Sequence, residues 1–251
     1  SKATGFPIAR IAAKLAIGYS LDEIQNDITK ETPACFEPSI DYVVTKIPRF
    51  TFEKFPNADD VLTTQMKSVG EAMAIGRTFK ESFHKAIRSL EVGYAGLDDF
   101  ELPEDRECLE DLWNKIEKPR PSRPWAIAEV LRRGVSVQEI SDRSGIDPWF
   151  VRQIEELVLV EKELSNINLG GLSSILRRVK ALGFSDARLA KIFSCDEREI
   201  RELRVKSDIH PVYKRVDTCG AEFEARTPYL YSTYEDECEA APTSRRKILI
   251  L

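Results

Sequence analysis

Residues 64–77 read TQMKSVGEAMAIGR, and this stretch decides how the first part of the chain folds. Polar and apolar residues alternate on both sides of Gly70, which predicts a strand over residues 67–75. A glycine inside a strand lets another segment of backbone approach closely. Glu71 then enters a mostly apolar run, where a carboxylate needs a cation or water as its partner. We therefore expect a strand at a crowded place, with Glu71 as its residue of interest.

The sequence around this strand predicts a mixture of helices and strands. Apolar residues at helical spacing predict three helices, over residues 7–17, 21–28 and 78–91. The second of these begins with a capping-box pattern formed by Ser20 and Glu23. β-branched residues predict a further strand over residues 40–47, ended by Pro48. Residues 1–91 are thus expected to form an α+β N-terminal piece.

The next part of the chain carries helix signals alone. A proline-rich break, PRPSRP at residues 119–124, precedes a pattern that recurs at an offset of 49 residues. The recurring positions include four expected helix N-caps, Ser136 and Asp147 in one copy and Ser185 and Asp196 in the other. Another helix is expected from the spacing of Leu109, Leu112, Trp113 and Ile116. We expect an all-α helical domain with an internal helical repeat.

Composition and charge exclude several classes of function. The net charge of -5 argues against a nucleic-acid partner and an anionic membrane partner, since both require a basic surface. No run approaches the ~20 apolar residues that a membrane span needs. The five cysteines form no CxxC pair, which predicts reduced thiols in a cytoplasmic protein. His84 and His210 are isolated from each other, which argues against a zinc site and a Ser–His–Asp triad.

Two helix pairs, over residues 137–164 and 186–206, have the spacing of helix-turn-helix motifs. A DNA-binding motif of this kind places base-reading groups at the start of its second helix. Those positions hold Asp147 in the first pair and Asp196 and Glu197 in the second, and these carboxylates would repel phosphate. DNA binding is therefore the less favoured interpretation, kept as the sharpest form of a free-standing helical interaction module.

The helical part also contains apolar side chains that suit either a core or a subunit contact. Trp125, Trp149 and Phe150 are expected in the core, which is the usual place for aromatic residues at helical spacing, with a subunit contact as the alternative for some of them. The ridge that ends at Leu164 is also assigned to the core by default. Four of its residues are kept as oligomerisation candidates, because an exposed apolar stripe is a common dimer surface: Val151, Ile154, Leu157 and Val158.

Several motifs together resemble the large subunit of carbamoyl phosphate synthetase, nearly from end to end. They are SKATG at residues 1–5, TPACFEPSIDYV at 32–43, MKSVGEAMAIGR at 66–77, DPWFVRQIEEL at 147–157, GFSDARLAKI at 183–192 and YLYSTYE at 229–235. The resemblance implies that residues 1–91 end a carboxyphosphate-forming ATP-grasp unit, which would be incomplete here. Residues 92–246 would be the helical oligomerisation domain with an extended tail. The apolar run at 247–251 would start the next ATP-grasp half, so the chain is expected to be a fragment.

The resemblance also implies a function for the complete enzyme. It would be an ATP-dependent ligase that makes carbamoyl phosphate from bicarbonate, ammonia and two ATP, with Mg (or Mn) and K as further cofactors. A glutaminase small subunit would supply the ammonia. The fragment itself is expected to bind no cofactor, to be catalytically inactive, and to self-associate through its helical domain without nucleic-acid or membrane partners.

Two residues of this chain are expected to line the tunnel that carries carbamate between the two active centres in this family. Glu71 matches a tunnel glutamate in the KSVGE motif, and Ala3 lies in a segment that borders the same path. The alternative for Glu71 is a structural strand glutamate paired with a nearby Arg or Lys, such as Arg77. Both interpretations of Glu71 stay open at this point.

Overall fold

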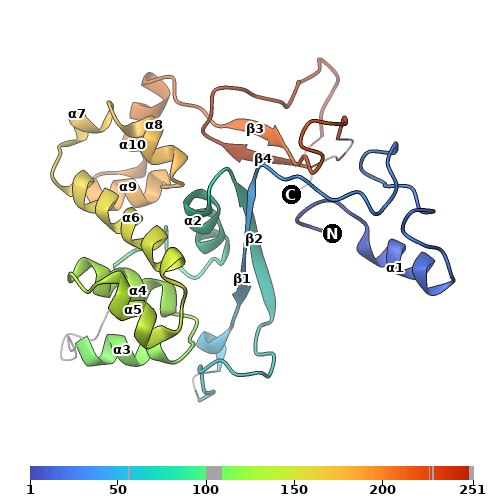
Figure 1. Ribbon diagram of the computed structural model, residues 1–251. Helices are drawn as coiled ribbons and strands as arrows, with labels where there is room; N and C mark the ends of the chain where they lie inside the picture. Colours follow the sequence, from blue (N-terminus) through green and yellow to red (C-terminus); the bar gives the residue numbers. More distant parts are fainter. Residues whose placement is uncertain (56, 100–108, 226, 228, 249–251) are drawn as a thin grey trace. The chain divides into compact units, whose positions relative to one another are not determined.

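The computed structural model describes residues 1–55, 57–99, 109–225, 227 and 229–248. The chain divides into two compact units, and each is described by itself. The helical unit is Val44–Ile209, and the terminal unit combines Ser1–Val43 with His210–Leu251. Figure 1 shows the order of the elements along the chain. In the described part of the chain, no helix has both the length and the apolar character needed to cross a membrane.

The helical unit begins with a small sheet and a helix packed against it. Strands β1 (Val43–Arg49) and β2 (Gly70–Gly76) pair with each other, and α2 (Phe79–Ser89) packs on β2 (Figure 1). A single 3-10 turn, η1 (Phe52–Lys54), follows β1. The later helices are α3 (Leu109–Glu117), α4 (Arg123–Arg132), α5 (Val137–Ser144), α6 (Pro148–Ser165), α7 (Leu169–Leu172), α8 (Leu176–Ala181), α9 (Asp186–Phe193) and α10 (Glu197–Lys206). The expectation of a mixed α and β chain with many helices is confirmed.

Helix α6 is the centre of this unit. It packs against α4, α5, α9 and α2, while α3 packs against α4 and α5. Leu157 and Leu164 of α6 are fully buried, as are Leu189 of α9 and Ile200 of α10. Burying an aliphatic side chain of this size contributes about 1.5–3 kcal/mol, so these residues stabilise the unit substantially.

The helix starts expected from the sequence are confirmed by their hydrogen bonds. The Ser136 hydroxyl accepts from the Glu139 N–H at 3.2 Å, and the Ser185 hydroxyl accepts from the Arg188 N–H at 2.9 Å. The Asp147 carboxylate accepts from the Trp149 N–H, and the Asp196 carboxylate accepts from the Arg198 N–H. Each bond satisfies a backbone donor that has no partner inside its helix.

The terminal unit is held together differently. It contains α1 (Ile8–Ala16) and a two-stranded antiparallel sheet, in which β3 (Val212–Arg215) pairs with β4 (Leu230–Thr233). Its described part includes two small clusters of buried apolar residues, and Phe6 packs against both. One cluster contains Ile11, Ile24 and Ala34, and the other contains Ile28, Cys219 and Ala225.

The prediction of a helix over residues 21–28 is wrong, because the structure has turns there and an isolated β-bridge between Gln25 and Pro33. One half of the expected capping box does form, since the Ser20 N–H donates to Glu23 Oε2 at 2.9 Å. Further along, Asn26 Oδ1 accepts from the Ile28 N–H at 2.9 Å. An asparagine side chain that bonds its own neighbouring backbone offers an alternative to helical hydrogen bonds.

The two expected strands exist, with different ends and different surroundings. β1 continues through Pro48 to Arg49, which a proline permits where its missing N–H is not needed for pairing. β2 begins at Gly70, and a Cβ built on that glycine meets no atom within 4 Å among the described residues. The expected close approach of another backbone at Gly70 is therefore not seen there. The strand expected at residues 248–251 falls mostly outside the described residues.

Candidate functional site

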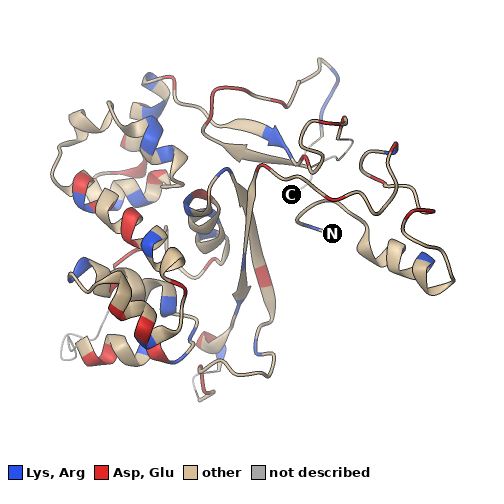
Figure 2. Cartoon of the chain, in the orientation of Figure 1, with Lys and Arg blue, Asp and Glu red and all other residues tan. Residues whose placement is uncertain are grey.

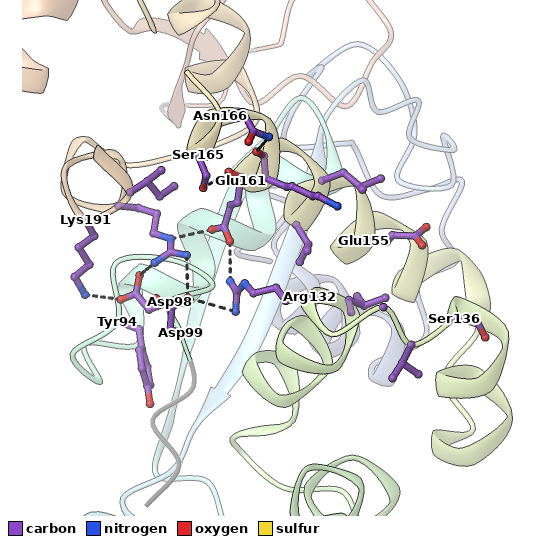
Figure 3. Close-up of a pocket in the computed structure, with 18 of the residues that line it drawn as sticks. Tyr94, Asp98, Asp99, Arg132, Ser136, Glu155, Glu161, Ser165, Asn166 and Lys191 are labelled. Atoms are coloured by element: carbon purple, nitrogen blue, oxygen red, sulfur yellow. Dashed lines mark hydrogen bonds and ion pairs between the residues drawn. The ribbon is translucent and has the colours of Figure 1, made fainter. Parts of the chain in front are cut away.

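A pocket of about 950 Å³ lies in the helical unit among the loop at residues 93–99, the end of α4, and helices α6 and α9 (Figure 3). Charged side chains of both signs line it, including Asp98, Arg132, Glu161, Arg188 and Lys191. These five residues come from four separate segments of the chain. We call them the ion network, because the dashed lines of Figure 3 join them to one another.

Arg188 is the centre of the ion network, and its side chain is only 6% exposed. Its Nε donates to Glu161 Oε1 at 2.8 Å, and its Nη1 donates to Asp98 Oδ1 at 3.2 Å. Burial alone would lower the pKa of this guanidinium, but the hydrogen bond to Glu161 and the charge of Asp98 outweigh burial, so the pKa of Arg188 is raised. The group therefore stays charged.

Two further cations complete the ion network. Lys191 Nζ lies 2.7 Å from Asp98 Oδ2, and Arg132 Nη2 lies 2.7 Å from Glu161 Oε2. Each buried carboxylate thus bridges two cations. Removing one partner from such a group leaves an uncompensated buried charge, which is much more costly than losing an exposed pair.

Local structure places these side chains. The Ser185 hydroxyl caps α9 and also donates to the Ala95 carbonyl at 2.9 Å, which joins the helix start to the loop that carries Asp98. The Ala95 N–H in turn donates to Asp98 Oδ2 at 2.8 Å. Gly93, at a φ of 89°, provides the left-handed conformation with which this loop begins.

The ion network suits a structural role better than a catalytic one. Neither a histidine nor a cysteine lines the pocket, and the described residues contain no group of three metal-ligating side chains. Arg132 Nη1 is buried and has no hydrogen-bond partner among the described residues, although the Nη2 of the same guanidinium bonds Glu161. The ion pairs of the network join α4, α6, α9 and the loop at residues 93–99 to one another.

Glu71 lies at the start of β2, and its side chain is partly exposed. Its Oε2 is 2.6 Å from Lys46 Nζ of β1, so the two residues form a cross-strand ion pair. A lysine was one of the two partner types expected for a structural glutamate. Arg77, at the other end of this strand, uses its backbone N–H to donate to Glu81 Oε2 at 2.7 Å.

Ala3 belongs to the terminal unit, whereas Glu71 belongs to the helical unit. The Ala3 carbonyl accepts a hydrogen bond from the Tyr42 hydroxyl at 2.8 Å. Burial, together with the charge of Asp41, raises the pKa of Tyr42 to about 12, so this hydroxyl remains a donor at neutral pH. The backbone at Ala3 is therefore fixed by a side chain from the segment before β1.

The four oligomerisation candidates are all buried inside the helical unit. Their exposed fractions lie between 0% and 6%, which confirms the default assignment of this ridge to the core: Val151, Ile154, Leu157 and Val158. On the same helix, Trp149 is 47% exposed, Phe150 45% and Leu159 56%. The expected core position is thus confirmed for Trp125 and wrong for Trp149 and Phe150.

The start of α6, which a DNA-reading helix would insert into a groove, is engaged within the protein. The rings of Trp149 and Phe150 meet the Phe79 ring of α2 edge-on, at centroid distances of 5.4 and 5.5 Å. Figure 2 shows acidic and basic residues interspersed on the helices of this unit. Binding of duplex DNA needs a concentrated basic surface, so this geometry does not support the helix-turn-helix alternative.

Sequence reasoning did not predict the ion network. Asp98, Glu161 and Arg188 are far apart in the chain, and each has the residue type of an ordinary solvated surface position. The one available signal is the position of Glu161, four residues after Leu157 and three before Leu164, which places it on the apolar side of its helix.

Comparison with known proteins places the chain in one group. A family model described as the carbamoyl-phosphate synthetase large chain, oligomerisation domain, matches residues 71–208. Proteins named carbamoyl phosphate synthase large chain align with all of this chain: 56% identical over 254 residues in Myxococcus xanthus and 57% over 256 residues in Pseudomonas syringae pv. tomato. A Neisseria meningitidis protein of that name is 56% identical over 253 residues. The chain covers 24%, 24% and 23% of these relatives, about a quarter of their length.

Proposed function

The chain belongs to the carbamoyl-phosphate synthetase large-chain family, and we propose that it is the architectural segment of such a large chain. One observation supports this most directly: the family match at residues 71–208 coincides with most of the helical unit at Val44–Ile209. A core centred on α6 and an ion network that joins four segments suit a rigid connector. In this proposal the segment provides no catalytic side chain.

The activity proposed for the whole protein is that of a glutamine-dependent ligase. It would convert bicarbonate, ammonia and two ATP into carbamoyl phosphate, with Mg (or Mn) and K, and with a glutaminase subunit as the source of ammonia. Residues 1–91 would complete an ATP-grasp unit, residues 92–246 would form the oligomerisation domain with its helical repeat, and residues 247–251 would begin the second half. The purified chain, given these substrates, is expected to form no carbamoyl phosphate.

We place self-association on α6. Four buried residues would anchor this helix in the core of its own unit: Val151, Ile154, Leu157 and Val158. The exposed apolar side chains of the same helix would then contact a second copy of the chain. Leu159 is the best single probe, because it is more than half exposed and its removal does not disturb the aromatic contacts of Trp149.

Sedimentation velocity over a range of concentrations tests this placement. Leu159→Arg should weaken association of the chain about tenfold or more, because a charge would be buried at the contact. Val205→Arg is the matched control, since Val205 is also about half exposed but lies on α10. Equal effects of both variants, or a chain that stays monomeric at all concentrations, would exclude α6 as the contact.

The tunnel role of Glu71 and Ala3 is a separate proposal. Its support is the similarity of the KSVGE and SKATG segments, together with the partly exposed carboxylate of Glu71 beside Lys46. The test uses Glu71→Ala in a complete synthetase of this family. Glutamine-dependent synthesis should then lose its coupling to the two partial ATPase reactions, and preserved coupling would end the proposal.

A further inference from the structure

A second cavity in the helical unit, of about 430 Å³, has a different chemistry from the pocket of the ion network. We propose that it binds a neutral, planar aromatic molecule that carries one polar group on its edge. We call this cavity the aromatic pocket. The lining residues that matter here are Phe50, Phe52, Leu62, Ile87, Tyr94 and Trp125.

Two pairs of rings form walls of the aromatic pocket. Phe50 and Phe52 are stacked, with centroids 5.8 Å apart and planes 18° apart. The ring centroids of Tyr94 and Trp125 lie 4.7 Å apart. The Trp125 indole is fixed because its Nε1 donates to the Gly96 carbonyl at 3.0 Å. Fixed aromatic faces favour a flat apolar ligand, which they can contact without losing rotamer freedom.

A hydrogen bond and an ion pair join two segments that line the aromatic pocket. The Leu62 N–H donates to the Pro119 carbonyl at 2.7 Å, and Asp60 forms an ion pair with Arg120. These contacts join the loop after η1 to the turn before α4. The volume of the aromatic pocket falls in the range of about 300–1,000 Å³ that is usual for small-molecule sites, which are mostly preformed and apolar.

The arginine side chains that line the aromatic pocket already have partners within the protein, which favours a neutral ligand. Arg49 is paired with Glu53 at 2.5 Å, and Arg120 is paired with Asp60. Arg123 donates to two backbone carbonyls, those of residues 116 and 117, at 2.6 and 3.0 Å. An anionic ligand would have to compete with these partners for each guanidinium, whereas an uncharged ligand disturbs none of them.

One uncharged polar side chain that lines the aromatic pocket can bond the polar group on the edge of the ligand. Ser122 lines the pocket just before α4, and its hydroxyl makes no capping bond to that helix. A serine hydroxyl both donates and accepts, so it can bond an N–H or a hydroxyl on the ring of a ligand. Indole is the simplest molecule with these properties, and 5-fluoroindole is a convenient probe.

Fluorine NMR of 5-fluoroindole with the 251-residue chain tests the proposal. We expect line broadening that saturates with a dissociation constant on the order of 0.1–1 mM, as is usual for a ligand of this size. The anionic probe 5-fluoroindole-3-acetate should bind no more tightly than the neutral one. Tighter binding of the anion by about fivefold or more would overturn the assignment of a neutral ligand.

Substitutions locate the binding. Phe52→Ala should weaken it by about fivefold or more, and Leu62→Trp should abolish it by filling the cavity. Phe55→Ala is the matched control, because Phe55 is a neighbouring phenylalanine that is exposed and outside the pocket. Ser122→Ala should weaken binding about two- to fivefold through one lost hydrogen bond.

Three outcomes would overturn the proposal. The first is no saturable binding by the wild-type chain, and the second is equal weakening by Phe52→Ala and Phe55→Ala while circular dichroism shows both variants folded. The third is binding to this chain that disappears in a complete synthetase of the family. That result would mean that another polypeptide segment covers the aromatic pocket.

Discussion

The helical unit and the terminal unit use different means to stay folded. The helical unit packs α2, α4, α5 and α9 against α6, buries many apolar side chains, and adds the buried ion network around Arg188. The described part of the terminal unit contains two clusters of three buried residues each, a few other buried side chains such as Tyr42 and Val216, and one short antiparallel sheet. Burial of apolar area provides most of the stability of a small domain, so we expect the helical unit to unfold last.

The largest effect should come from Arg188. Replacing it in Arg188→Met leaves the carboxylates of Glu161 and Asp98 buried without their shared cation, which should cost about 3–5 kcal/mol of unfolding free energy in the helical unit. Urea denaturation followed by far-UV circular dichroism measures this change. Arg198→Met is the control, since Arg198 is largely exposed and should matter by less than about 1 kcal/mol. Equal effects of the two variants would show that the ion network does not stabilise this unit.

The next largest effect should be a pH dependence of stability that belongs to the helical unit. His84 of α2 is fully buried, and burial together with the charge of Arg88 lowers its pKa from 6.5 to about 3. The unfolded chain therefore binds a proton below pH 6.5 that the folded chain excludes down to pH 3, so stability decreases as pH falls through this window. Between pH 7 and pH 5 the loss should be about 2 kcal/mol.

Urea denaturation at both pH values checks this expectation in wild type and in His84→Gln. The variant should lose the part of the pH dependence that comes from His84, whatever its stability at pH 7. An unchanged slope in the variant would mean that other groups cause the acid sensitivity of the helical unit. The same measurement with a probe in the terminal unit should show no contribution from His84, because that residue belongs to the helical unit.

A smaller effect is expected from Tyr42 in the terminal unit. Tyr42→Phe removes the hydrogen bond to the Ala3 carbonyl, which should cost about 1 kcal/mol. The raised pKa of about 12 adds a pH signature, because the wild-type contribution is complete below pH 10 and is lost as pH rises toward 12. Hydrogen exchange of residues 1–43 should accelerate in the variant while α6 stays protected. Acceleration throughout the chain would show that the two units unfold together.

The same contrast explains how much could be predicted from the sequence. The caps Ser136, Asp147 and Ser185 depend on atoms two or three residues away, so local pattern was sufficient to predict them. The expected helix over residues 21–28 failed because the side chain of Asn26 bonds its own neighbouring backbone. Tertiary contacts were harder still: nothing near Arg188 in the sequence indicates that it meets a loop 90 residues before it. Prediction was therefore most reliable for helix starts and least reliable for charged residues that join distant segments.

The smallest stability effect is expected at the Glu71–Lys46 pair. Both side chains are at least one third exposed, and solvent screens such pairs, so Glu71→Gln should cost only about 0.2–1 kcal/mol. A double-mutant cycle with Lys46→Met, measured by urea denaturation, gives the coupling energy directly. A coupling well above 1 kcal/mol would make Glu71 a structural residue, whose loss would disturb any enzyme in which it stands. A small coupling would mean that β2 folds without this carboxylate. Loss of ATPase coupling in Glu71→Ala of a complete synthetase would then report on the proposed tunnel, and not on the stability of the strand.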